Sequence, residues 1–258
     1  MNQPTIGFIG GGRVARIILG GWNHAQALPA RIVVADPNAE GLARLKARFP
    51  SVETTADAAV AAGQDVVFLA THPPVLAEAA ARVTPGLKPT AIVVSLAPKF
   101  TLARLTGLLG GFGRLARVNP NAPSVIGAGF NPIAFGAALN AADRAVVSGL
   151  LAPLGDSPEV AEEKIEAFAL LTAMGPTYLW FQLQALRELG ASFGLTEAET
   201  NHGIKRMVCG AARTLVDSGL PPAEVMDLVP VKPLAEMEPT VLEFYRTRLP
   251  ALYQKIKP

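Results

Sequence analysis

Residues 5–15 read TIGFIGGGRVA, a short apolar run that leads through three glycines into a helix-forming segment. The pattern satisfies Gly-x-Gly-x-x-Ala, which is typical of the first strand-turn-helix of a dinucleotide-binding domain. Gly10 permits a tight turn, Gly12 lets a pyrophosphate approach the backbone, and Ala15 allows close packing of helix on strand. We therefore expect the turn formed by Gly10, Gly11, Gly12, Arg13 and Val14 to bind a cofactor, with a purely structural turn as the alternative.

Four further apolar runs follow, at residues 32–35, 66–70, 91–94 and 115–118, separated by helical patterns such as 39–49 and 75–83. Runs that are apolar on both faces and rich in β-branched residues are typical of buried parallel strands. Alternation of strands with helices predicts an α/β fold with a Rossmann-type, mostly parallel sheet. We place this dinucleotide-binding domain at residues 1–138.

Residues 139–258 are predicted to form an all-helical substrate and dimerisation domain. Apolar positions in 176–195 fall on one helical face, and Thr196 with Glu199 forms a capping box for the next helix. A last helix is expected over 234–253, either continuous or interrupted at Pro239 and Pro250. Exposed apolar faces need burial, so we expect a homodimer or larger homo-oligomer through this half, with Trp180 and Phe181 in the core or the interface.

Composition excludes several classes of function. The chain has 258 residues, a formal charge of +2 and no run of Lys or Arg, which argues against a nucleic-acid partner. Its single cysteine, Cys209, allows neither an intramolecular disulfide nor a cysteine-based metal site, and no metal site is predicted. The apolar stretches are too short for a membrane span, and no basic segment precedes the first strand. We expect a cytoplasmic protein.

Asp36 ends the second predicted strand, where a carboxylate accepts hydrogen bonds from a ribose 2′-hydroxyl and repels a 2′-phosphate. The expected cofactor is therefore NAD(P)H, with a slight preference for NAD. In the alternative interpretation Asp36-Pro37-Asn38 is a turn that caps the following helix.

Four ordered motifs carry a family resemblance. They are residues 6–15 (IGFIGGGRVA, compared with IGFIGxGNMA), 69–73 (LATHP, compared with LAVKP), 117–123 (RVNPNAP, compared with VRxMPNTP) and 174–178 (MGPTY, compared with the end of SGSGPAY). Over about residues 5–229 the chain resembles the pyrroline-5-carboxylate reductases. The resemblance implies an oxidoreductase that transfers hydride from a reduced nicotinamide to the C=N, or C=O, carbon of a small substrate. It also implies positions for the ligands: Gly10, Gly12, Ala70, Thr71, His72 and Asn119 at the cofactor, and Asn121, Thr172, Gly175 and Thr177 around the substrate.

Residues 230–235 (PVKPLA) depart from the family, whose members carry a glycine-rich TSPGGTT loop there. Two prolines lack amide hydrogens, so the backbone cannot hold an anion in the same way. Lys232 could hold a substrate carboxylate instead, or be solvated, and Lys99 after the fourth strand has the same two interpretations. A reductase of another imine or oxo acid and a cofactor-binding sensor without catalysis are the alternatives.

Candidate catalytic residues are His72, Thr172, Thr177 and Tyr178. His72 follows a strand at the edge where ligands of α/β sheets bind, and it could donate a proton, contact the cofactor or be an ordinary loop side chain. Thr177 and Tyr178 open a long helix, and Tyr178 could face a ligand or pack between domains. Hydride transfer itself is cofactor chemistry, so few acid–base groups are required.

Overall fold

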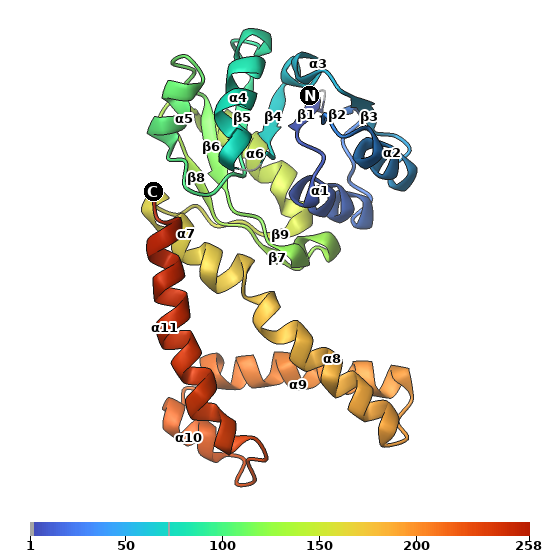
Figure 1. Cartoon of the computed structure of the whole chain (residues 1–258), viewed down its shortest axis with the longest axis vertical. Helices are drawn as coiled ribbons and strands as arrows, with labels where there is room; N and C mark the ends of the chain where they lie inside the picture. Colours follow the sequence, from blue (N-terminus) through green and yellow to red (C-terminus); the bar gives the residue numbers. More distant parts are fainter. Residues whose placement is uncertain (1–2, 72) are drawn as a thin grey trace. The chain divides into compact units, whose positions relative to one another are not determined.

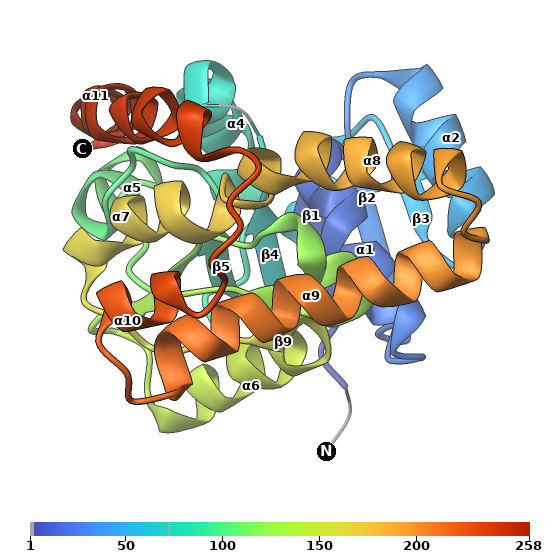
Figure 2. The same ribbon diagram turned by 90° about the horizontal axis from the view of Figure 1, so that it is seen from below.

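The computed structural model describes residues 3–71 and 73–258 (Figures 1 and 2). The chain divides into two compact units, one of Met1–Met174 with Tyr253–Pro258 and one of Gly175–Leu252. Within the described residues, no helix combines the length and apolar character needed to cross a bilayer.

The first unit contains the strands. They are β1 (Ile6–Ile9), β2 (Ile32–Ala35), β3 (Glu53–Thr55), β4 (Val66–Leu69), β5 (Ile92–Ser95), β6 (Leu115–Val118), β7 (Gly129–Phe130), β8 (Ile133–Phe135) and β9 (Gly155–Asp156). Seven of them form one sheet in the order β3-β2-β1-β4-β5-β6-β8, in which only β8 is antiparallel to its neighbour. The other pairings are parallel, and the order 3-2-1-4-5-6 is that of the doubly wound dinucleotide-binding sheet, so the predicted fold class is confirmed.

Helices cover both faces of this sheet. They are α1 (Arg13–His24), α2 (Ala39–Arg48), α3 (Ala58–Ala62), α4 (Pro73–Val83), α5 (Leu102–Leu108), α6 (Ala141–Leu151) and α7 (Ile165–Phe168), with short turns η1 (Thr84–Gly86), η2 (Ala122–Ile126), η3 (Ala152–Leu154), η4 (Glu162–Lys164) and the π-helical turn η5 (Ala169–Ala173). One apolar cluster joins α1, α2 and α6 to one face, and a second joins α3, α4 and α5 to the other. Alternate strand residues enter the two clusters, for example Phe8 and Ile9 of β1, as the period of a strand requires.

The first unit extends to Met174, beyond the expected boundary at 138 and 139. Helix α6 contributes Val147 and Leu151 to the core, and the indole nitrogen of Trp22 donates to the carbonyl of Leu150 at 2.7 Å. Strand β9 pairs with β7, so the expectation of an all-helical second half is wrong for residues 155–156. Residues 139–174 thus complete the sheet unit, because their apolar side chains cover the sheet.

The second unit is helical. It contains α8 (Pro176–Ser192), α9 (Glu197–Asp217), α10 (Pro222–Asp227), η6 (Ala235–Met237) and most of α11 (Glu238–Ile256), which includes Pro250. Figure 2 shows α8 and α9 as long helices joined at one end. The capping box of Thr196 and Glu199 is confirmed at the start of α9, and a Cβ atom on Gly190 would lie 2.5 Å from the side chain of buried Thr200. Trp180 and Phe181 are exposed on this unit, so they belong to no core within the chain.

Candidate cofactor site

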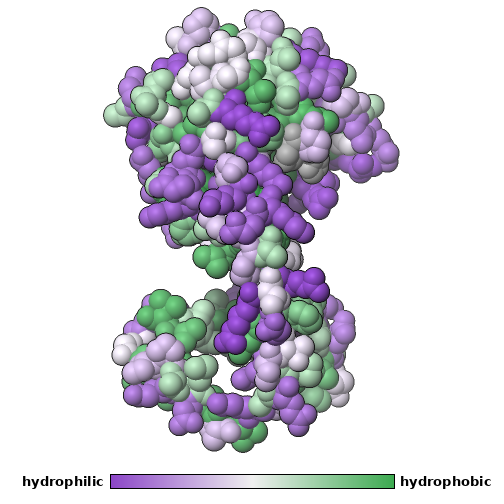
Figure 3. All heavy atoms as spheres, turned by 60° about the vertical axis from the view of Figure 1, so that its left-hand side comes forward, coloured by the Kyte–Doolittle hydropathy of each residue, from purple (hydrophilic) through white to green (hydrophobic). Residues whose placement is uncertain are grey.

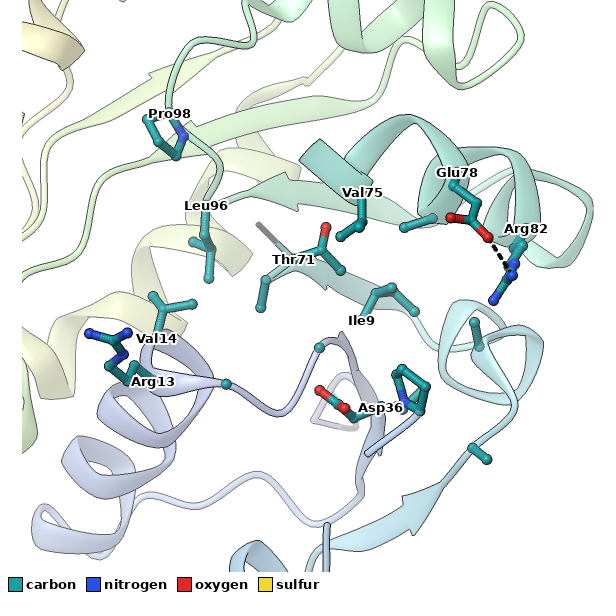
Figure 4. A pocket seen from close by; sticks show the side chains of 18 residues that line it. Ile9, Arg13, Val14, Asp36, Thr71, Val75, Glu78, Arg82, Leu96 and Pro98 are labelled. Carbon is teal, nitrogen blue, oxygen red and sulfur yellow. Dashed lines mark hydrogen bonds and ion pairs between the residues drawn. The ribbon is translucent and has the colours of Figure 1, made fainter. Parts of the chain in front are cut away.

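A pocket of about 780 Å³ lies at the carboxyl ends of β1, β2, β4 and β5 (Figure 4). Its lining comes from the loops and helices that follow these strands: Ile9, Gly10, Gly12, Arg13, Val14, Ala35, Asp36, Pro37, Ala56, Ala58, Ala70, Thr71, Val75, Glu78, Ala79, Arg82, Leu96 and Pro98. Figure 4 shows Val14 of α1, Thr71 of the loop after β4 and Leu96 of the loop after β5 around one space. The connections after β1 and β4 diverge here to opposite sides of the sheet, which is where open α/β sheets bind ligands.

The glycine turn is shaped by close contact with the next loop. Gly10 has φ +106°, and a Cβ atom there would lie 2.8 Å from the carbonyl oxygen of Ala70, so only glycine fits. A Cβ atom on Gly12 would meet nothing within 4 Å, so the space in front of the turn is open. No side chain caps α1, and its first amides therefore remain available to an anion.

Asp36 links the glycine turn to the end of β2. Its Oδ2 accepts a hydrogen bond from the Gly11 amide at 2.8 Å, and its Oδ1 accepts one from the Asn38 amide at 2.8 Å. The side chain of Asn38, not that of Asp36, caps α2 by accepting from the Gly41 amide. Asp36 thus takes part in the turn and also lines the pocket.

Polar atoms without partners lie beside the pocket on its β4–β6 side. The hydroxyl oxygen of Thr71 and Nδ2 of Asn119 are buried and form no hydrogen bond. Asn119 lines a small separate cavity, which shares Leu96 and Pro98 with the pocket. The open space at Gly12, the uncapped helix and these unsatisfied groups fit a polar ligand such as a dinucleotide.

Besides Asp36, two arginines and one glutamate bring charge to the lining of the pocket. Arg82 forms an ion pair with Glu78 one helical turn away, while Arg13 is exposed at the start of α1 (Figure 4). The described residues contain no group of three or more His, Cys, Asp or Glu side chains suited to a metal ion.

Asn121 and Thr172, both predicted near the substrate, lie together. Nδ2 of Asn121 donates to the carbonyl of Thr172 at 3.1 Å, and Oδ1 of Asn121 accepts from the Phe130 amide at 3.0 Å. Thr172 belongs to η5, and π-helical turns are frequent at functional sites.

The remaining predicted residues belong to the second unit. Gly175 precedes α8, and Lys232 is exposed between α10 and η6. The ring of Tyr178 packs edge-on against that of Tyr245 with centroids 5.7 Å apart. Partial burial, and to a lesser degree Tyr245, raises the pKa of the Tyr178 phenol above its usual value.

Comparison with known proteins decides the family. A family model described as NADP oxidoreductase coenzyme F420-dependent matches residues 5–99. The pyrroline-5-carboxylate reductase of Corynebacterium melassecola is 30% identical over 226 residues, which cover 86% of this chain and 84% of that protein. The chain belongs to the pyrroline-5-carboxylate reductase family. The pyrroline-5-carboxylate reductase of Pseudomonas aeruginosa is 29% identical over 99% of this chain and 93% of its own length.

Solved structures agree with this assignment to the pyrroline-5-carboxylate reductase family. A pyrroline-5-carboxylate reductase from Coxiella burnetii is 27% identical, with a TM-score of 0.70 over 99% of this chain and 95% of that chain. The Plasmodium falciparum pyrroline carboxylate reductase with NADP bound shares the fold, with a TM-score of 0.83, 18% identity and coverage of 100% and 98%.

In this member of the pyrroline-5-carboxylate reductase family, most residues predicted at the cofactor line one pocket: Gly10, Gly12, Arg13, Val14, Asp36, Ala70 and Thr71. Gly11 lies behind the turn with its amide on Asp36, Asn119 lines the neighbouring cavity, and His72 is outside the described residues. Sequence reasoning missed Val75, Glu78, Ala79 and Arg82 of α4. Their i, i+3, i+4, i+7 spacing places them on one face of a helix that follows a strand, and this pattern in the sequence could have indicated that they line a common surface.

Proposed function

We propose that this protein is a reductase that uses NAD(P)H to reduce the C=N, or C=O, carbon of a small substrate. The observation that carries the proposal is the pocket at the carboxyl edge of the sheet, built on a glycine turn that leaves room only on its outer side. A bound reduced nicotinamide supplies the hydride. The protein then has to bind the cofactor and the substrate, orient them and exclude water from the site.

Different parts of the pocket would serve different parts of the cofactor. Amides of Gly12, and of Arg13 and Val14 at the start of α1, would hold the pyrophosphate, since the amides of Gly10 and Gly11 already donate to Ala35 and Asp36. Asp36 keeps acceptor capacity on both carboxylate oxygens for a ribose, and its negative charge favours NAD over NADP. Thr71 and Asn119, with buried unsatisfied groups, are candidates for the nicotinamide half.

The substrate would lie next to this half, and Asn121 and Thr172, which the fold holds together, are proposed to border it. Gly175, Thr177, Tyr178 and Lys232 of the helical unit stay predictions from the sequence. Relatives named pyrroline-5-carboxylate reductase make that imine the first substrate to test, while the prolines of residues 230–235 favour a related imine or oxo acid.

The helical unit is proposed to bind a second copy of this chain. Of residues 175–252, all of them described, only Gly190 and Thr200 are buried. Large apolar side chains such as Phe181, Phe193 and Val216 are 69%, 75% and 78% exposed, and Figure 3 shows apolar side chains on the surface of this unit. A unit without a core of its own needs a partner to bury its apolar faces.

The test is oxidation of NADH and of NADPH, side by side, with pyrroline-5-carboxylate and then with a panel of imines and 2-oxo acids. Turnover of any of them supports a reductase. Cofactor binding without turnover of any substrate would favour the sensor alternative instead, and absence of binding would refute both.

A further inference from the structure

Lys99 has an unusual backbone conformation. Among the described residues, only Gln26 and Lys99 are non-glycine residues with positive φ, at 54° and 70°. Side chains are disfavoured in this left-handed region, and such strain is concentrated at functional sites. Gln26 follows the carboxyl end of α1, remote from the glycine turn where α1 begins, whereas Lys99 lies in the loop after β5.

This loop borders the candidate cofactor site. Leu96 and Pro98 line the pocket, and Lys99 is the next residue along the chain. Strand β5 lies on the β4–β6 side of the sheet, opposite the β2 end that carries Asp36, and this side takes the nicotinamide half in the doubly wound fold. The reacting carbon of a substrate belongs at this half.

A buried ion cluster holds the loop in place. The Lys99 amide donates to Oε1 of Glu166 at 3.3 Å, and the Leu102 amide donates to Oε1 of Glu162 at 2.6 Å. Both carboxylates bind the guanidinium of Arg117, which is 2% exposed, at 2.5 and 2.9 Å. One bond at the strained residue and a second bond three residues further along thus hold the loop in place, as stored strain requires.

The charge of Lys99 is not neutralised within the chain. Its side chain is exposed, and no ion-pair partner for its ammonium group occurs in residues 3–71 or 73–258. In contrast, Arg82 at the other side of the pocket is paired with Glu78. A lysine has a long flexible stem, so a cation one residue beyond the lining can reach a small anion in the pocket.

We propose that Lys99 binds the carboxylate of the substrate and thereby makes the site prefer an acid over its neutral counterpart. The proposal rests on the proposed function. This role explains why a lysine occupies a position at which glycine would avoid the backbone strain, because only the lysine supplies a cationic side chain there.

The experiment separates the effect of the Lys99 charge from that of the backbone strain with three variants. Lys99→Met removes the charge and keeps the strain, Lys99→Gly removes both, and the control Gln26→Gly removes strain elsewhere.

Calorimetry would measure binding of cyclobutanecarboxylate, with cyclobutanecarboxamide as its neutral counterpart, to protein saturated with NADH. We expect both Lys99 variants to bind the carboxylate about tenfold more weakly and the amide unchanged, whereas Gln26→Gly binds both like the wild type. Lys99→Gly should nonetheless have a higher melting temperature than Lys99→Met.

Equal carboxylate affinity in wild type and Lys99→Met would overturn the proposal, and so would a wild type that binds no carboxylate. Failure of the proposed function has a different signature, because it appears as absent NADH binding or absent turnover in the wild type. In that case the same carboxylate titration, without cofactor if necessary, still decides the role of Lys99.

Discussion

The carboxylate of Asp36 accepts a hydrogen bond from the amide of Gly11 at 2.8 Å, across 25 positions of sequence. This bond joins the ends of β1 and β2 where the glycine turn begins, so the shape of the turn depends on a residue from the neighbouring strand. Because Asp36 also lines the pocket, one side chain both braces the turn and presents negative charge to a ligand.

Asp36→Asn should therefore weaken cofactor binding. The amide group keeps one acceptor but loses the charge, so the affinity for NADH should fall about tenfold and the preference for NADH over NADPH should decrease. Fluorescence titration with both cofactors measures this. Asp143→Asn, which disrupts the capping box of α6, serves as a control that lowers stability without changing affinity. Unchanged cofactor affinity in Asp36→Asn would remove Asp36 from the site.

Gly10→Ala should mainly lower the stability of the protein, whereas Gly12→Ala should mainly lower its affinity for the cofactor. At Gly10 the positive φ and the contact with Ala70 should lower the free energy of unfolding by about 2–3 kcal/mol. At Gly12 the new methyl group meets no protein atom, so the stability should change little while cofactor affinity falls at least about tenfold. Chemical unfolding and cofactor titration separate the two effects. Normal binding by Gly12→Ala would mean that no ligand approaches this turn.

Asp65 should make stability depend on acid pH. Its carboxylate binds Lys88 and accepts from the amide and hydroxyl of Thr5, and these bonds, that of Lys88 first, lower its pKa from 3.8 to about 2. A lowered folded-state pKa contributes stability that is present above the unfolded value and is lost as pH falls from about 4 through 2. Melting temperatures of the wild type and Asp65→Asn should thus differ at neutral pH and converge toward pH 2. A constant difference across this range would contradict the assignment.

Phe181→Asp tests the proposed homodimer. Phe181 is 69% exposed in the single chain, so in a monomer its replacement would hardly matter. In a dimer built through α8 the charge would be buried, and light scattering should show a shift from dimer to monomer together with a lower melting temperature. Val60→Asp on α3, where the replaced side chain is 44% exposed, is the matched control and should leave the mass unchanged. A monomeric wild type would refute the interface.

The strands of the sheet were predictable where apolar residues fill both faces, as in Ile32–Ala35 and Val66–Leu69. Strand β3 was missed because Glu53, Thr54 and Thr55 form a short and polar edge strand, and β8 because Pro132 and Gly136 bracket three residues. The domain boundary was misplaced since an amphipathic helix such as α6 does not reveal which surface it covers.

The glycine turn was the predictable part of the site, since its chemistry is local. Residues of α4 line the pocket because the fold places this helix beside it, which their helical spacing in the sequence does not show by itself. The strained backbone of Lys99 could not be predicted, because Glu166 and Glu162, more than 60 positions away, hold it in place.

The central claim is that the pocket of the first unit binds a nicotinamide dinucleotide, and direct titration of the purified protein with NADH and NADPH tests it. We predict saturable binding with one cofactor per chain, tighter for NADH, and its loss in Gly12→Ala without loss of folding. No saturable binding of either dinucleotide by a folded wild-type protein would contradict the account.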